Sequence, residues 1–162
     1  MSGPPPSRAT LIKRPNTLKA KVGSGGELTP QMRSAADRVL GSLAVDYPAL
    51  ALADINRMIQ LLQAAKDEPA KAAEALHAIH RIAHDMRGQG GSFGYPLMTR
   101  IAASLSLLTE TLTRYDAEVQ GVVRAHLEAM RAIITKRTTG EGDATAQQIV
   151  KALDFAARKV KP

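Results

Sequence analysis

Apolar residues recur every three to four positions along most of this chain, and this helical spacing limits most strongly how the chain can fold. The pattern runs from about residue 30 to about residue 156, and no strand-like alternation rises above it. Aromatic residues make up only 3% of the chain and Trp is absent, so Ala, Leu, Ile, Val and Met must build the core. We predict an all-α fold, an antiparallel helical bundle, because the connections between helices are short.

Prolines and capping residues divide this pattern into helices. Thr29 suits an N-cap and Pro30 a first helical position, and Pro48 is expected to begin a second helix. The later helices are expected to start at about Pro69, Pro96, Asp116 and after a loop at 137–143. The residues expected on core-facing stripes are Met32, Ala35, Ala36, Val39, Leu40, Leu43, Leu52, Ile55, Ile59, Leu62, Ala75, Ile79, Ile82, Met86, Phe93, Leu97, Ile101, Leu105, Leu108, Leu112, Val119, Val122, Val123, Leu127, Met130, Ile134, Ile149, Leu153 and Ala156.

Residues 1–28 lack this periodicity. They hold four prolines and the GSGG run at 23–26, so we predict a disordered tail at 1–28 and a bundle domain at 29–162. Five Lys and Arg residues against one Glu give this tail about four of the chain's seven net positive charges. The tail is either simply solvated or steers the chain toward an acidic partner or nucleic acid. No aromatic residues alternate with the basic ones, which makes nucleic acid the less favoured partner.

Several classes of protein are disfavoured by composition. The chain has no cysteine, which excludes disulfides and thiolate zinc sites. No apolar run approaches the length of a membrane span, and the proline-rich start is too polar for a signal peptide. We expect a soluble, cytoplasmic protein that makes no contact with a membrane.

Four glycines in seven residues follow His84, and each glycine inside a helix costs about 1 kcal/mol relative to alanine. On a helical wheel His84 lies opposite the apolar stripe, and Arg87, Gly88 and Gly91 share its side. Bare backbone on an exposed surface suggests that another body comes close. A nucleophilic imidazole beside a cation and a cleared surface suits the acceptance of a phosphoryl group from a docked protein.

The segment HDMRGQGGSFG at 84–94 resembles the motif of histidine-phosphotransfer (HPt) domains in two-component signal transduction. The resemblance implies a four-helix HPt-type core plus an additional N-terminal helix, with His84 phosphorylated on Nε2 as a phosphorelay intermediate. It also implies that Arg87 stabilises the phosphoryl group. The positions expected to meet the partner are Gly88, Gly91, His80 and Gln89. Ser106 occupies the register where the family often has a Gln or Glu that holds the histidine ring, and is a candidate for that role.

The resemblance further implies a phosphocarrier, not an enzyme with autokinase activity, because the chain has no room for an ATP-binding α/β domain. The expected partners are response-regulator receiver domains and a hybrid or cognate histidine kinase. No cofactor is expected on this chain, and the Mg²⁺ would belong to the partner receiver domain. A helical adaptor or a basic nucleic-acid-binding protein without phosphotransfer stays open as the alternative function.

Other interpretations concern the same histidines and glycines. His84 could be an ordinary surface histidine at the end of a glycine-rich helix. A nucleotide-binding glycine loop is rejected, since Phe93 stands where its third glycine would be. His77, His80 and His84 share a helical face and two of them could hold zinc or nickel, but no carboxylate is expected beside them, so we predict no metal site. His126 is predicted to lie on a polar face.

Overall fold

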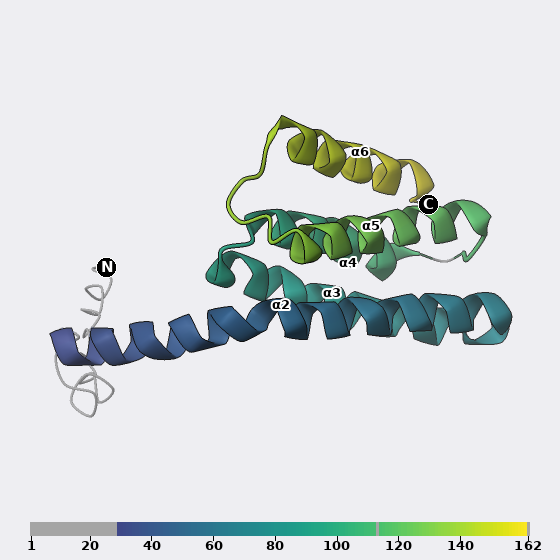
Figure 1. The fold of residues 1–162 in the computed structure, drawn as a ribbon. Helices are drawn as coiled ribbons and strands as arrows, with labels where there is room; N and C mark the ends of the chain where they lie inside the picture. Colours follow the sequence, from purple (N-terminus) through teal and green to yellow (C-terminus); the bar gives the residue numbers. More distant parts are fainter. Residues whose placement is uncertain (1–28, 113, 162) are drawn as a thin grey trace, which may run out of the picture. The chain divides into compact units, whose positions relative to one another are not determined.

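The computed structural model describes residues 29–112 and 114–161, and the regular structure in these two ranges is entirely helical (Figure 1). The α-helices are α2 (Pro30–Asp67), α3 (Ala72–Gly90), α4 (Pro96–Thr111), α5 (Ala117–Thr135) and α6 (Ala144–Val160). Two single 3₁₀ turns, η1 (Pro69–Lys71) and η2 (Gly91–Phe93), flank α3. The prediction of an all-α helical bundle is therefore confirmed.

Two compact units are distinguished in the chain, Met1–Ala36 and Asp37–Pro162. In the first unit the structure describes residues 29–36, which begin α2. The Thr29 hydroxyl accepts the backbone N–H of Met32 at 3.2 Å, so Thr29 is the N-cap that the sequence predicted. The predicted disordered tail at 1–28 lies outside the described residues, and the division at residue 28 stays a prediction.

The prediction that Pro48 begins a second helix is wrong, because Pro48 lies inside the continuous helix α2. Proline removes one helical hydrogen bond and crowds the preceding turn, at a cost of about 3 kcal/mol. Burial offsets this cost on the same stretch: Tyr47 is 1% exposed and Ala51 2% exposed, and both belong to the main core cluster. The local signal of a proline was thus outweighed by tertiary packing.

The first part of α2 contradicts a second expectation. Met32 and Val39, predicted to face the core, are 57% and 58% exposed, and Ala35 and Ala36 are exposed as well. The helical spacing was read correctly, but these four side chains do not face the core; the side chains of Leu40 and Leu43, predicted on the same stripe, lie outside the described part of the structure. Periodicity shows which residues share a face and cannot show whether another element lies against that face.

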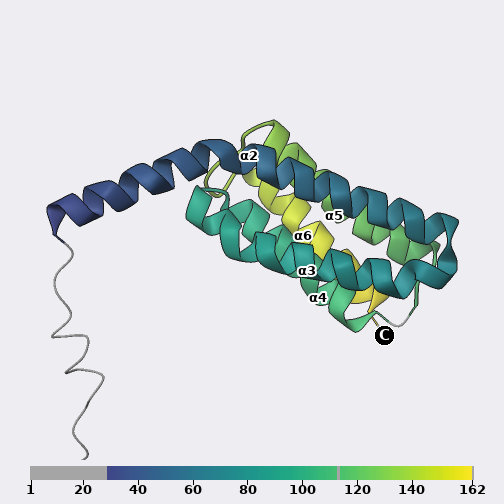
Figure 2. The same cartoon turned by 90° about the horizontal axis from the view of Figure 1, so that it is seen from below.

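The core of the second unit is built by the later part of α2 together with α3, α4, α5 and α6 (Figures 1 and 2). Helix α4 contacts α3, α5 and α6, and α5 also contacts α6. Accordingly α4 is the most apolar helix, and its Leu97, Met98, Leu105 and Leu108 are fully buried. Beyond Ala51, α2 contributes Ile55, Met58 and Leu62, and runs beside α3 in both views.

Capping explains where most helices of this unit begin and end. Gly94 adopts φ 82° after η2, a left-handed conformation that glycine tolerates best, and Pro96 follows as the first residue of α4. The Asp116 carboxylate accepts the N–H of Val119 at 3.0 Å at the start of α5. Asp143 likewise accepts the N–H of Ala146 at 2.8 Å at the start of α6. The predicted starts of α4 and α5 are therefore correct.

Two hydrogen bonds join the connections on either side of α5 to parts of the chain that are distant in sequence. The Gly140 N–H, in the loop between α5 and α6, donates to the Gly94 carbonyl at 2.9 Å. The Tyr115 hydroxyl, before α5, donates to the Leu62 carbonyl of α2 at 2.9 Å. These bonds fasten the two connections that lead into and out of α5 onto the rest of the bundle.

The expected stripe on α6 is partly wrong. Leu153 is buried, but Ile149 is 46% exposed and Ala156 is only half-buried, while Val150 and Ala157 face the core. The predicted face is rotated by about one residue from the observed one. None of the described helices is long and apolar enough to cross a membrane.

Candidate functional site

His84 lies on the exposed side of α3, as the helical wheel predicted. Its neighbours Ala83 and Met86 are buried, as is Ile79 one turn earlier, so the opposite side of the helix packs on the core. The imidazole is left open to solvent, and a phosphoryl donor could approach it without any rearrangement of the core.

The glycines after His84 fall into two groups with different causes. A Cβ added at Gly88 would meet nothing within 4 Å, and one at Gly91 would meet only the Thr99 hydroxyl at an ordinary 3.6 Å. The packing of the described chain therefore does not require glycine at either position. At Gly90 an added Cβ would lie 2.9 Å from the Thr99 backbone nitrogen and 3.0 Å from the Tyr95 carbonyl oxygen. Gly90 is needed for the close approach of α3 and α4, a role that the sequence analysis did not assign.

The far end of the α3 segment is fixed by aromatic side chains. Phe93 stacks on Tyr47 of α2 with ring centroids 4.8 Å apart, and Tyr95 lies 5.4 Å from the same ring. Burial, with Tyr95 and Asp54 nearby, raises the pKa of Tyr47 to about 12, so its hydroxyl stays protonated at neutral pH. These contacts hold the glycine-rich turn in place although its glycines contribute no side chains.

Arg87 and Gln89 are exposed beyond His84, on α3 and near its end. Arg87 lies one turn from His84, which puts its guanidinium within reach of a group carried by the imidazole. No ion pair between described residues includes Arg87, so this cation is available to an anionic group.

A row of three histidines follows the exposed side of α3. The ring centroids of His77 and His80 are 6.5 Å apart, and those of His80 and His84 are 6.1 Å apart. Within the described ranges, no group of three or more His, Cys, Asp or Glu side chains is arranged to hold a metal ion.

Ser106 lies beside His80 rather than His84. The Nδ1 of His80 is 2.9 Å from the Ser106 carbonyl oxygen, so this nitrogen carries the proton and donates it, and the Ser106 hydroxyl is 3.4 Å from the same Nδ1. No hydrogen bond between described residues joins Ser106 to His84. The predicted register on α4 was therefore one helical turn away from the ring that Ser106 contacts.

A hollow beside His84 is lined by side chains of both α2 and α3, and some of these residues were missed by the sequence analysis. Its lining includes Asp54 and Arg57 of α2 and His80, His84, Asp85 and Gln89 of α3. Burial raises the pKa of the Asp54 carboxyl, Arg57 opposes this rise, and Asp85 adds to it. Asp54 and Arg57 are three positions apart in the sequence, but only the pairing of α2 with α3 places them beside His84.

His126 differs from its prediction. It was expected on a polar face, but it is fully buried at the contact of α5 with α4. Its Nδ1 donates to the Val122 carbonyl at 2.8 Å, and its Nε2 lies 3.1 Å from the Ser104 hydroxyl, from which it accepts. Burial lowers the pKa of His126, which favours the neutral form of the ring. Both ring nitrogens are occupied, which makes His126 a structural residue.

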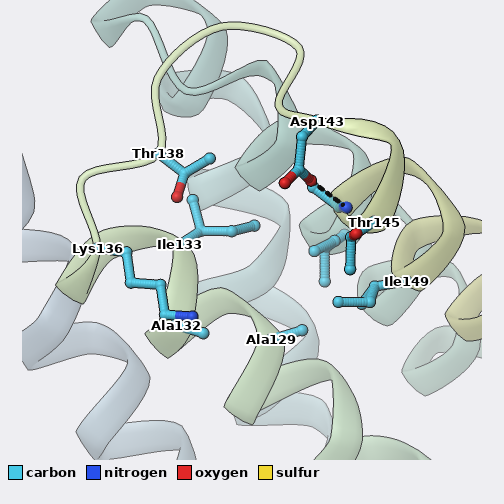
Figure 3. A pocket seen from close by; sticks show the side chains of 10 residues that line it. Ala129, Ala132, Ile133, Lys136, Thr138, Asp143, Thr145 and Ile149 are labelled. Atoms are coloured by element: carbon cyan, nitrogen blue, oxygen red, sulfur yellow. Dashed lines mark hydrogen bonds between the residues drawn. The ribbon is translucent and has the colours of Figure 1, made fainter.

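A second cavity lies between α5 and α6 and has a different chemistry (Figure 3). It measures about 240 Å³, and Ala129, Ile133 and Ile149 give it an apolar lining. The Asp143 carboxylate at its edge is directed to the start of α6, where it accepts the Ala146 N–H. None of the site residues predicted from the sequence lines this cavity.

Comparison with known proteins assigns most of the helical bundle to a family. A family model described as Hpt domain matches residues 46–133, more than half of the chain, and this range includes His84 and the whole glycine-rich turn. No curated protein and no solved structure gives a match.

Proposed function

We propose, from the premise that this chain belongs to the Hpt domain family, that it accepts a phosphoryl group on His84 and passes it on. Hpt domains are phosphocarriers rather than catalytic enzymes, and they act in histidine phosphotransfer within phosphorelays. They interact there with receiver domains and kinases. The observation that carries the assignment to His84 is its exposure beside Gly88 and Gly91, where no packing against the described residues requires glycine.

In the proposed transfer, the Nε2 lone pair of His84 attacks the phosphorus of an aspartyl phosphate on a receiver domain. The new N–P bond forms as the P–O bond breaks, and the electrons of that bond remain on the aspartate carboxylate. Any proton released from the ring goes to solvent. The reverse step, with a second receiver, returns the phosphoryl group to an aspartate.

The residues around His84 take simple roles in this step. Arg87, one helical turn away, offsets the negative charge of the phosphoryl group. Gly88 and Gly91 leave room for the receiver, and His80 and Gln89 border the contact. The Mg²⁺ belongs to the receiver. We further propose that the chain has no autokinase activity, that its donor is a hybrid or cognate histidine kinase system, and that it acts in the cytoplasm.

The test is incubation of the full chain with a receiver domain that carries radioactive phosphate on its aspartate. We expect acid-labile label on the wild-type chain and none on His84→Gln, with equal helical circular dichroism for both. His77→Gln is the matched control from the same face and should take up label normally. If the chain is an adaptor without phosphotransfer, the wild type will stay unlabelled with every receiver. Loss of label in His77→Gln alone would show that the acceptor is His77 and not His84.

A further inference from the structure

We infer that Asp54 and Arg57 of α2 act in opposite directions on the stability of the phosphoryl group at His84, and so set how readily this carrier gives it up. The inference rests on the proposed function, because it concerns the same histidine. It adds two residues from a different helix, neither of them within the glycine-rich motif.

The geometry gives both residues access to the site. They are three positions apart on α2, so they share one side of that helix, and both line the hollow that contains His84. Asp54 is half-buried and Arg57 is exposed. A phosphoryl group on His84 would project into or beside this hollow, where both charges act on it.

Arg57 is free to respond to a new anion. No ion pair between described residues includes Arg57, Asp54 or Asp85, although Arg57 and Asp85 are each close enough to influence Asp54 electrostatically. The Arg57 guanidinium therefore lies within the field of the Asp54 carboxylate without forming an ion pair with it. A phosphoryl group with nearly two negative charges would attract it more strongly than either carboxylate does.

The carboxylates have the opposite effect. The hollow already holds the negative charges of Asp54 and Asp85, which lie near each other, beside the cations Arg57 and Arg81 of the same lining. Phosphorylation of His84 adds more, and the repulsion raises the free energy of the phosphorylated state relative to the free one. A carrier gains from this balance, because a phosphoryl group that is bound too firmly cannot be passed on.

The experiment measures the equilibrium constant for phosphoryl exchange between the full chain and a Mg²⁺-loaded receiver domain labelled on its aspartate. At concentrations below the dissociation constant of the complex, this ratio depends only on the free species, so changes in docking affinity do not enter it. Asp54→Asn should shift the equilibrium toward phosphorylated His84 by about two- to fivefold, and Arg57→Gln should shift it away by a similar factor, as expected for one nearby exposed charge. Both shifts should shrink as salt rises.

Matched controls carry the same charge changes elsewhere on the bundle. Glu128→Gln and Arg131→Gln alter exposed residues of α5 that do not line the hollow, and they should leave the equilibrium unchanged. Equal constants for all four variants, or shifts of the same sign for Asp54→Asn and Arg57→Gln, would overturn the inference while His84 still takes up phosphate. Failure of the wild type to take up phosphate would instead overturn the proposed function.

Discussion

His84 and His126 place the same side chain in opposite surroundings within one bundle. His84 is exposed on α3, with open backbone beside it at Gly88, whereas His126 is buried against α4 with both ring nitrogens occupied. The surroundings of His126 are fully explained by contacts inside the chain. No contact within the described residues explains those of His84 in the same way, and the proposal of a site there rests on this difference.

Replacing each of the two histidines separately gives the sharpest test of this comparison. His84→Gln should abolish phosphate uptake and leave the unfolding free energy within about 0.5 kcal/mol of wild type, since exposed positions contribute little. His126→Leu should keep phosphate uptake but lose about 1–3 kcal/mol of unfolding free energy, because the half-buried Ser104 hydroxyl loses its hydrogen-bond partner. Urea unfolding and receiver labelling measure the two effects. Comparable stability losses in both variants would remove the distinction.

The glycines offer a second contrast, between Gly90 and Gly88. Gly90→Ala should lower the unfolding free energy by about 1–2 kcal/mol, because its Cβ would press on the backbone of α4. Gly88→Ala is the matched control and should raise it by up to about 1 kcal/mol through helix propensity. Thermal unfolding of both variants checks the signs. A stabilised Gly90→Ala would mean that α3 and α4 are not in close contact there.

The buried histidine should also make stability depend on pH. The pKa of His126 is lowered in the folded state, so below about pH 6.5 the unfolded chain binds a proton more readily than the folded chain does. The contribution of the neutral His126 ring to the unfolding free energy is fully present above about pH 6.5. It is lost as the pH falls, by at most about 1.4 kcal/mol per pH unit. Urea unfolding from pH 7.5 to 5 should show this fall in wild type and a smaller one in His126→Leu. Identical slopes would place the effect in other groups.

The smallest expected effect concerns access to His84. Gly88→Gln should raise the unfolding free energy by a few tenths of a kcal/mol and the melting temperature slightly. It should slow phosphotransfer, because a side chain now covers the proposed docking surface. Stopped-flow or rapid-quench transfer from a labelled receiver measures the rate. Arg131→Gln on α5 serves as a control for unrelated surface change. Unchanged transfer with raised stability would show that the glycine does not serve the partner.

Local chemistry accounts for what the sequence predicted correctly. Thr29, Gly94, Pro96 and Asp116 mark helix ends through their own backbone preferences and hydrogen bonds, which do not depend on distant parts of the chain. The exposure of His84 followed in the same way from helical periodicity, because the apolar residues of α3 clearly occupy the opposite side.

The failures have a common cause in tertiary contacts. Pro48 continues a helix because Tyr47 beside it is buried, and Val39 is exposed because no described element covers it. Ser106 contacts His80 instead of His84 because the relative shift of α3 and α4 along their axes cannot be obtained from either helix alone. Asp54 lies beside His84 because α2 pairs with α3, and periodicity does not reveal this pairing.

The hydrogen bond from Gly140 to the Gly94 carbonyl has a consequence for changes in chain length. Exposed loops usually accept insertions, and the loop between α5 and α6 looks like a suitable place for a tag or a grafted segment. Its Gly140, however, is fastened to the residue that closes the helix segment carrying His84. An insertion before Gly140 would pull on that turn, so the choice of a fusion site in this protein also affects the geometry around the proposed phosphoacceptor.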